Sequence, residues 1–134
     1  MHSTNYANTF IAVADDCPTD VGSVPPKKQD PTIARMQYEM IRDHPYRYTS
    51  DEVVFAIYAA KNRIEAADIE SQRAAFFSKG QPCLRSSPLG KRYGWGIHSN
   101  DASKIALYAH ESEEYTQLSN DTTLKQLKAM KSAR

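Results

Sequence analysis

Apolar residues recur along the chain with two periods, and each period predicts one kind of element. A short apolar run at residues 9–14 is bounded by Asp15 and Asp16, so we expect a strand there. Residues 17–31 contain four prolines and show no apolar periodicity. This composition predicts a long surface loop.

Three segments have the apolar spacing of helices. The first predicted helix begins after the N-cap Thr32 and ends at His44, because a proline follows. In the second, Thr49 and Glu52 fit a capping box, and the apolar stripe runs to about Arg63. These signals predict both helices and the residues at which they begin.

The third predicted helix begins at about Ala66 and closes at Gly80, which we expect in the left-handed C′ conformation. Further on, Ser112 has the position of a cap for a short helical turn. Residues 121–130 also have helical spacing and form a candidate final helix. Its apolar positions are Leu124, Leu127 and Met130, and its solvated face carries Lys125, Lys128 and Lys131.

Residues 93–109 contain two runs that alternate with period two around a polar turn, which predicts a β-hairpin. We expect Ile97 to lie opposite Ile105, and Trp95 opposite Leu107. A slip by one residue would move these apolar side chains to the wrong face. We therefore expect this face to pack against the helices.

Two glycines, Gly94 and Gly96, fall on the other face of the predicted hairpin. Glycines weaken a strand unless something approaches its backbone closely. A ligand, a packed loop or a neighbouring ring such as that of Tyr108 would each account for them. The loop and the ring are the commoner explanations.

Together these elements predict an α+β fold in a single domain of residues 1–134. We expect a small antiparallel sheet that includes the 93–109 hairpin and the 9–14 strand, with about three helices packed on one face. A chain of 134 residues with 40% hydrophobic residues is sufficient to bury one core without disulfides or metals.

Composition narrows the class of protein. The net charge of +1 argues against a dedicated basic DNA-binding domain. The longest apolar run, residues 53–60, is far shorter than the ~20 residues of a membrane span. The N-terminus lacks the features of a secretory signal, and Cys17 and Cys83 are too few for a disulfide framework. We therefore expect a cytoplasmic protein with reduced cysteines and no membrane partner.

Residues 71–100 contain no acidic residue but five cationic ones. Cations, hydroxyls and flexible glycines close together are typical of an anion site, and a short helix opened by Ser87 would add free N–H groups. We hypothesise that the 78–98 segment binds an anion such as a phosphorylated metabolite or a nucleotide. The candidate ligand-binding residues are Lys79, Arg85, Ser86, Ser87, Lys91, Arg92 and Tyr108. An ordinary basic surface loop is the alternative interpretation.

Single-stranded nucleic acid is a variant of the same hypothesis, because aromatic rings beside a basic loop can stack bases. The predicted register turns Tyr93 and Trp95 toward the core and leaves Tyr108 on the open face. This variant is therefore not favoured over a small anionic ligand.

A thiol-dependent enzyme is an alternative of another class. Cys83 lies among cations, which favour the thiolate, whereas Cys17 follows two aspartates. His98 or His110 would serve as the base if the fold brought either one close to the thiol. The candidate catalytic residues are therefore Cys83 and His98.

The chain carries none of the common cofactor signatures. HExxH and CxxC spacings are absent, as are a P-loop, a GxGxxG fingerprint and a GxSxG elbow. We expect no metal site and no cofactor.

A third functional hypothesis is a protein-interaction module that uses the 17–31 loop or an exposed sheet edge.

Several short segments resemble those of a known family. They are residues 4–6 (Thr-Asn-Tyr), 8–11 (Asn-Thr-Phe-Ile), 16–18 (Asp-Cys-Pro), 32–35 (Thr-Ile-Ala-Arg) and 48–51 (Tyr-Thr-Ser-Asp), and above all the stretch from Phe76 to His98. The family consists of small uncharacterised proteins of bacteria and some fungi, and is described as a domain of unknown function. The resemblance covers almost the full length. It implies a self-contained domain and supplies no functional residue to carry over.

Overall fold

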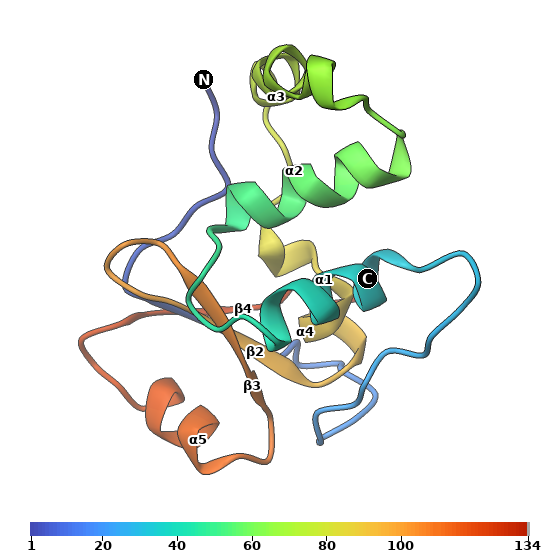
Figure 1. The fold of residues 1–134 in the computed structure, drawn as a ribbon. Helices are drawn as coiled ribbons and strands as arrows, with labels where there is room; N and C mark the ends of the chain where they lie inside the picture. The colour runs from blue at the N-terminus through green and yellow to red at the C-terminus, as the bar shows by residue number, and fades with distance from the viewer. Residues whose placement is uncertain (134) are drawn as a thin grey trace.

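The computed structural model describes residues 1–133 and contains a four-stranded sheet (Figure 1). The strands are β1 (Thr9–Ala12), β2 (Trp95–Ser99), β3 (Ile105–Ala109) and β4 (Lys125–Lys128), in the spatial order β3-β2-β1-β4. β2 runs antiparallel to β1 and β3, whereas β4 runs parallel to β1. The predicted α+β class is confirmed, but the parallel pair departs from the all-antiparallel sheet that we expected.

Helices lie on both faces of this sheet (Figure 1). They are α1 (Ile33–Arg42), α2 (Ser50–Lys61), α3 (Ile69–Phe77), α4 (Pro88–Arg92) and α5 (Glu113–Ser119), with short 3-10 turns at Ala66–Asp68 and Leu84–Ser86. On one face of the sheet, α1 contacts β3 and α4 contacts β2. Helix α2 packs against both α1 and α3. On the other face, α5 contacts β1 and β3. None of the helices in residues 1–133 has the length and apolar character that a membrane span requires.

The caps of α1 and α2 are those that the sequence predicts. The Thr32 hydroxyl accepts a hydrogen bond from the N–H of Arg35 at 3.2 Å. At the start of α2, Thr49 and Glu52 form both hydrogen bonds of a capping box. Each cap satisfies backbone N–H groups that the first turn of a helix leaves free.

The prediction of a left-handed Gly80 is wrong. The third predicted helix is a 3-10 turn followed by α3. The C-cap of α3 is Ser78, whose N–H donates to the carbonyl of Ala75. Among the glycines, positive φ occurs at Gly94 instead. The helix therefore ends in a tight turn, without a left-handed residue at C′.

The hairpin is confirmed, but its register differs by two residues from the predicted one. Ile97 lies opposite Leu107, not Ile105. The turn explains this difference, because the Asn100 side chain accepts from the N–H of Lys104 at 2.9 Å and the Asn100 N–H donates to the Lys104 carbonyl. A shift of two residues keeps every side chain on its predicted face.

Residues 121–130 contain a strand, β4, and the predicted helix is wrong. The strand pairs with β1 from Lys125 opposite Thr9 to Lys128 opposite Ala12. The β4 strand hydrogen-bonds to backbone groups of β1, which would lie unpaired at the sheet edge if residues 121–130 were helical. This long-range pairing outweighs the helical spacing of the apolar residues. Lys125 and Lys128 therefore lie on opposite faces of the sheet instead of on one helix face.

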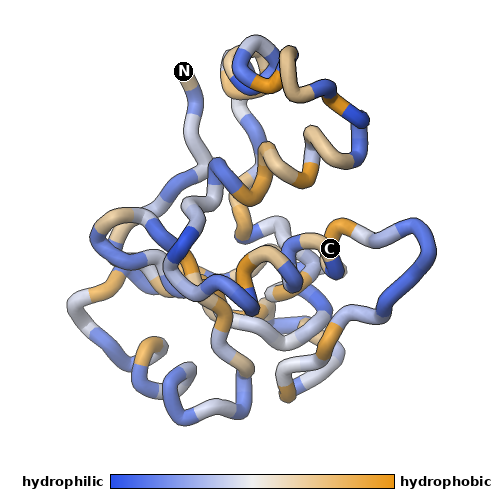
Figure 2. Tube along the Cα trace, viewed as in Figure 1, coloured by the Kyte–Doolittle hydropathy of each residue, from blue (hydrophilic) through white to orange (hydrophobic). Residues whose placement is uncertain are grey.

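The main core lies between the sheet and the helices above it. Its central residues include Ile41 of α1 and Val53 of α2, which pack with Ile97, Ile105 and Leu107 of the hairpin. The hydropathy-coloured trace shows apolar stretches along α2 and the strands, whereas the 26–31 loop is hydrophilic (Figure 2). The apolar face of the hairpin is thus the one that packs on the helices, as predicted.

The glycine strip of β2 is covered by protein. The rings of Phe10 and Tyr115 lie over Gly96, and the Val21 carbonyl lies against Gly94, which has a φ of +78°. A packed loop and neighbouring rings therefore account for both glycines. The Tyr108 ring, which was given as an example of such a ring, is not among the atoms nearest to either glycine.

Candidate functional site

The structure places the predicted ligand-binding residues in several separate positions. Lys79 is exposed beyond the end of α3. Arg85 Nε donates to the carbonyl of Lys128 at 2.7 Å, and the Ser86 hydroxyl donates to Met130 Sδ at 3.3 Å. Arg85 and Ser86 therefore hold the chain at the end of β4.

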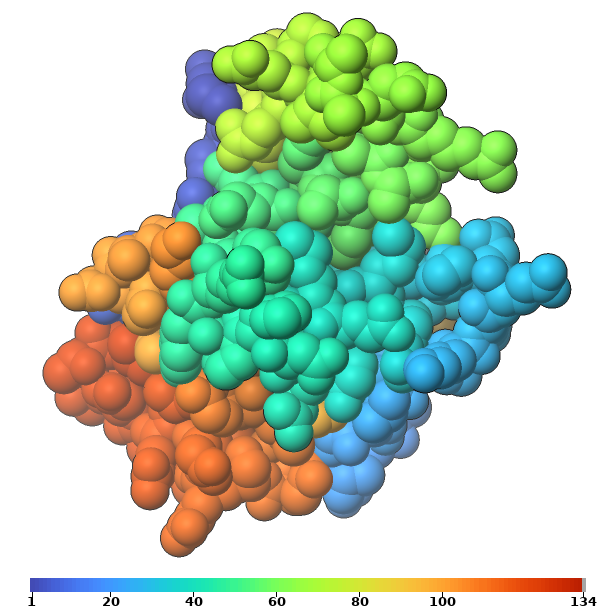
Figure 3. All heavy atoms as spheres, viewed as in Figure 1, coloured from blue at the N-terminus to red at the C-terminus, as the bar shows by residue number. Residues whose placement is uncertain are grey.

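An apolar cavity of about 510 Å³ lies between α1, α2, α3 and residues 82–88. We call it the apolar cavity, and α1 and α2, which form two of its walls, lie side by side in Figure 3. Its apolar lining includes Val54, Ile57, Tyr58, Phe76 and Leu84. Polar groups enter this lining at a few points, of which Gln37 and Cys83 are the most informative.

Gln37 places an oriented amide in the wall of the apolar cavity. Its side chain belongs to α1 and the residue is only 7% exposed. The Ser87 hydroxyl accepts from the N–H of Leu89 and donates to Gln37 Oε1 at 2.5 Å. This bond fixes the direction of the amide. Gln37 Nε2 has no hydrogen-bond partner within residues 1–133, so its N–H groups are available to an acceptor in the cavity.

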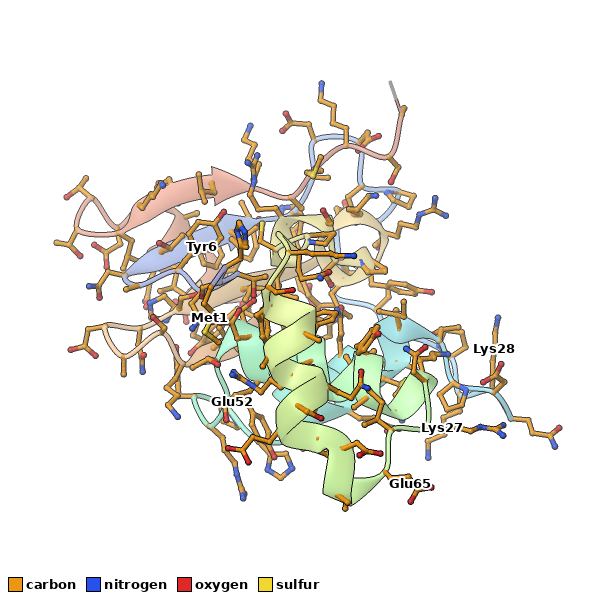
Figure 4. The ribbon with its side chains drawn as sticks, turned by 90° about the horizontal axis from the view of Figure 1, so that it is seen from above. Met1, Tyr6, Lys27, Lys28, Glu52 and Glu65 are labelled. Carbon is orange, nitrogen blue, oxygen red and sulfur yellow. The ribbon has the colours of Figure 1, made fainter. Side chains whose placement is uncertain are left out.

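Cys83 contributes a free thiol to the same wall. Its Sγ lies 3.5 Å from the hydroxyl of Tyr6, which comes from the N-terminal segment beside the sheet (Figure 4). The pKa of Tyr6 is raised, first by this hydrogen bond and then by burial. The phenol therefore keeps its proton at neutral pH and is able to donate to the sulfur.

A second cavity, of about 420 Å³, adjoins the first. We call it the cationic cavity, because Lys91 and Arg92 line it together with the first residues of α1. Ile33 and Pro88 belong to the walls of both cavities, so the two are neighbours on the surface. Ile33 is 48% exposed.

The charges of the cationic cavity favour an anion. Within residues 1–133, neither Lys91 nor Arg92 lies within 4.0 Å of a carboxylate oxygen. The N-terminal end of α1 faces the same cavity and has no acidic residue in its first turn. The N–H groups of Ile33 and Ala34 have no partner in the described part of the chain. A helix N-terminus with free N–H groups adds to the positive potential of the two side chains.

His98 and Tyr108 lie on the other face of the sheet from the apolar cavity. The Tyr46 hydroxyl bridges them, at 2.7 Å from His98 Nδ1 and 2.7 Å from the Tyr108 hydroxyl. Burial lowers the pKa of His98, although the charge of Asp121 acts in the opposite direction. His98 is thus bonded to a tyrosine, and Cys83 to a different tyrosine, so the structure does not pair thiol and histidine.

The two edges of the sheet differ. At the β3 edge, the Tyr46 N–H donates to the Ile105 carbonyl and the Ile105 N–H donates to the Tyr48 carbonyl. The side chains of β4, at the other edge, are mostly exposed. The interaction-module hypothesis stays a prediction.

Sequence reasoning missed Gln37 and Tyr6. Gln37 lies four residues from both Ile33 and Ile41, so a polar residue interrupts the apolar stripe of the first helix, and this was the available signal. Tyr6 gives no comparable signal, because it meets Cys83 across 77 residues of sequence. Long-range contacts of this kind are not encoded in local spacing.

Comparison with known families identifies the chain. It matches, over residues 1–134, the family described as a family of unknown function (DUF6157). The chain belongs to this family. No curated protein and no solved structure matches it. The function of this DUF6157 member therefore has to be argued from its own site.

The placement of potential metal ligands in this DUF6157 chain limits what the site could bind. Among residues 1–133, no three His, Cys, Asp or Glu side chains are grouped closely enough to hold a metal ion. The chemistry available at the two cavities is instead that of two side-chain amides, a thiol, hydroxyls, three cations and apolar walls; the cations are Lys61, Lys91 and Arg92.

Proposed function

We propose that this protein binds a small amphipathic anion, with its apolar body in the apolar cavity and its carboxylate or phosphate at Lys91 and Arg92. The observation that carries this proposal is the Gln37 amide. Gln37 is only 7% exposed, its Oε1 is held by the Ser87 hydroxyl, and the residue lines the apolar cavity. A binding site of this kind usually combines apolar walls with a few fixed polar groups.

The dimensions of the cavities support a small molecule. A volume of about 510 Å³ falls within the range of about 300–1,000 Å³ that is typical of ligand sites. The adjoining cationic cavity gives an anionic head a place beside the body of the ligand. This proposal keeps the predicted anion and part of the 78–98 segment, but it assigns Arg85 and Ser86 a structural role. We further propose a cytoplasmic location, which the two free cysteines support.

Four ligands with the same ten-carbon chain test the proposal. Isothermal titration calorimetry below the micellar concentration compares decanoate, decyl phosphate, decanol and decylamine. We expect the two anions to bind and decylamine to bind at least about tenfold more weakly, because it places a cation beside Lys91 and Arg92. Equal affinity for decanoate and decylamine, or no binding of any of the four, would contradict the proposal.

Matched charge variants locate the head group. Lys91→Gln combined with Arg92→Gln is expected to weaken decanoate binding about tenfold or more, since both charged contacts are lost. The control is Lys27→Gln combined with Lys28→Gln, which removes the same charge from the loop labelled in Figure 4. Lys27 and Lys28 are exposed and line neither cavity. Equal losses in the two double variants would show a nonspecific charge effect.

A thiol-dependent enzyme is the second candidate, because Cys83 lies in the wall of the same cavity. Hydrolysis of p-nitrophenyl decanoate distinguishes it from a binding protein. Repeated turnover that Cys83→Ser abolishes and Cys17→Ser preserves would favour an enzyme. Release of at most one equivalent of nitrophenol would favour a binding protein whose thiol reacts once.

A further inference from the structure

Three features of the apolar cavity together suit an electrophilic ligand. Cys83 supplies a nucleophile, Gln37 Nε2 supplies a hydrogen-bond donor with no other partner in residues 1–133, and the walls are mostly apolar. Gln37 is the observation that points to a ligand, because this 7% exposed residue lines the same cavity as the thiol and its Nε2 has no hydrogen-bond partner within residues 1–133. A thiol alone would not define a site.

One short turn connects the thiol to the serine that orients the Gln37 amide. Cys83 precedes the 3-10 turn Leu84–Ser86, and Ser87, which orients the Gln37 amide, follows it. The turn is closed by hydrogen bonds from the Ser86 N–H to the Cys83 carbonyl and from the Ser87 N–H to the Leu84 carbonyl. Cys83 and Gln37 both line the apolar cavity, one directly before the turn and the other bonded to the residue that follows it.

We propose that Cys83 captures an α,β-unsaturated carbonyl ligand in the apolar cavity by conjugate addition. This inference rests on the proposed function, because the same cavity must hold the ligand. The bond that forms joins Sγ to the β-carbon, and the π bond between the α- and β-carbons breaks. Its electrons form an enolate whose oxygen accepts a hydrogen bond from Gln37 Nε2. The thiol proton passes to water, and water returns a proton to the α-carbon, so no oxidant or leaving group is needed.

Tyr6 fits this reaction as a positioning residue. Its hydroxyl lies 3.5 Å from Sγ, within hydrogen-bond distance, and holds the sulfur at the cavity wall. Cys17 provides an internal comparison, since it is also a half-buried free thiol but does not line the apolar cavity. Selective addition at Cys83 therefore reports the cavity and not general thiol reactivity.

The probe is 9-oxoundec-10-enoate, which carries a vinyl ketone at one end of an apolar chain and a carboxylate at the other. Mass spectrometry of the intact protein and of its peptides follows the adduct. We expect one equivalent at Cys83, formed about tenfold faster than at Cys17, and slowed by the saturated acid 9-oxoundecanoate. Equal rates at the two cysteines, or labelling of Cys83 that the saturated acid does not slow, would overturn the inference.

Calorimetry with 9-oxoundecanoate separates the two proposals, because this acid binds without reacting. Binding of the saturated acid together with equal labelling of both cysteines would overturn covalent capture and leave the proposed function intact. Absence of binding by the saturated acid would overturn both. The two failures are therefore distinguishable in one pair of measurements.

Gln37 variants test the donor. Gln37→Glu keeps an acceptor for the Ser87 hydroxyl and removes the N–H groups, and Gln37→Met removes the donor without adding charge. At saturating probe, we expect the addition rate at Cys83 to fall about tenfold in both variants, because one hydrogen bond to the enolate is lost. Methyl methanethiosulfonate, which has no carbonyl, is expected to react with Cys83 at a rate within twofold of that of the parent protein. Unchanged addition rates in both variants would overturn the role of Gln37.

Discussion

Gly96 allows two aromatic rings to pack closely on the face of the sheet that α5 covers. An ideal Cβ at this position would lie 2.5 Å from Phe10 Cζ and 2.7 Å from Tyr115 Cε2. The two rings meet edge to face with centroids 5.0 Å apart, and the Tyr115 hydroxyl accepts from the Val13 N–H at 2.9 Å. Neither ring is therefore free to retreat from an added methyl group.

Gly96→Ala is expected to lower the free energy of unfolding by about 1–3 kcal/mol, because the methyl group overpacks this contact. Urea unfolding followed by circular dichroism measures the change. Gly80→Ala is the matched control, since its Cβ would meet only His2 Nδ1 at 3.8 Å. The control should be neutral or slightly stabilising. Equal destabilisation by the two substitutions would contradict this account of Gly96.

The stability of the protein should fall as His98 becomes protonated. Burial lowers the pKa of His98 below its ordinary value, so in that pH range the unfolded chain binds more protons than the folded one. Stability is therefore retained above about pH 6.5, the ordinary histidine value, and decreases as the pH falls through the lower folded value. Thermal unfolding between pH 8 and 5 measures this dependence. His98→Gln should flatten it, and an equally steep decrease in that variant would assign the effect to other groups.

At the scale of elements, α2 shows that local sequence signals are sufficient to locate the start of a helix when all the interacting residues lie within one turn. Its start is fixed by Thr49, whose hydroxyl accepts from the Glu52 N–H at 3.2 Å, and by Glu52, whose carboxylate accepts from the Thr49 N–H at 2.9 Å. Both partners lie within one helical turn, so sequence alone locates this cap. β4 is the opposite case, because its pairing with β1 is remote in sequence.

Thr49→Ala is expected to destabilise the protein by about 1 kcal/mol, since the N-cap hydrogen bond is lost. Thermal and urea unfolding measure the change. Thr116→Ala makes the same chemical change at an exposed position inside α5 and should be close to neutral or slightly stabilising. A loss in Thr49→Ala no larger than that in Thr116→Ala would show that the capping box contributes nothing measurable.

At the scale of the whole molecule, the N-terminal segment ties the sheet side of the chain to the helices. The Asp51 carboxylate, at the start of α2, accepts from the Ser3 hydroxyl at 2.7 Å and from the N–H and hydroxyl of Thr4. The His2 N–H donates to the carbonyl of Phe77 at the end of α3. The segment thus crosses the helices before Tyr6 reaches Cys83 at the apolar cavity.

Thr4→Val should cost about 1–3 kcal/mol of stability, because Thr4 is buried and its hydroxyl bonds to Ser50 and Asp51 would be lost. Thr122→Val is the isosteric control at an exposed position. Hydrogen exchange at the start of α2 provides a second measurement, and faster exchange is expected there in Thr4→Val. Identical unfolding curves for the two variants would show that this N-terminal contact is not stabilising.

The candidate site combines residues that sequence could predict with residues that it could not. Cys83, Lys91 and Arg92 were identified from their own segment, because unusual local composition is visible without a fold. Their division between an apolar and a cationic cavity depends on α1 packing against α4, which no local pattern records. Gln37 illustrates both cases. The sequence shows that Gln37 interrupts an apolar stripe, but only the structure shows its hydrogen bond to Ser87.

The sequence by itself determined the α+β class, the starts of α1 and α2, and the faces of the 93–109 hairpin. These features depend on caps and on periodic burial, in which the interacting residues are at most a few positions apart. Tertiary structure decided that residues 125–128 form a strand, that aromatic rings cover Gly96, and which side chains line the two cavities. These features depend on contacts between residues far apart in the chain, whose free energy outweighs local propensity once the core has formed.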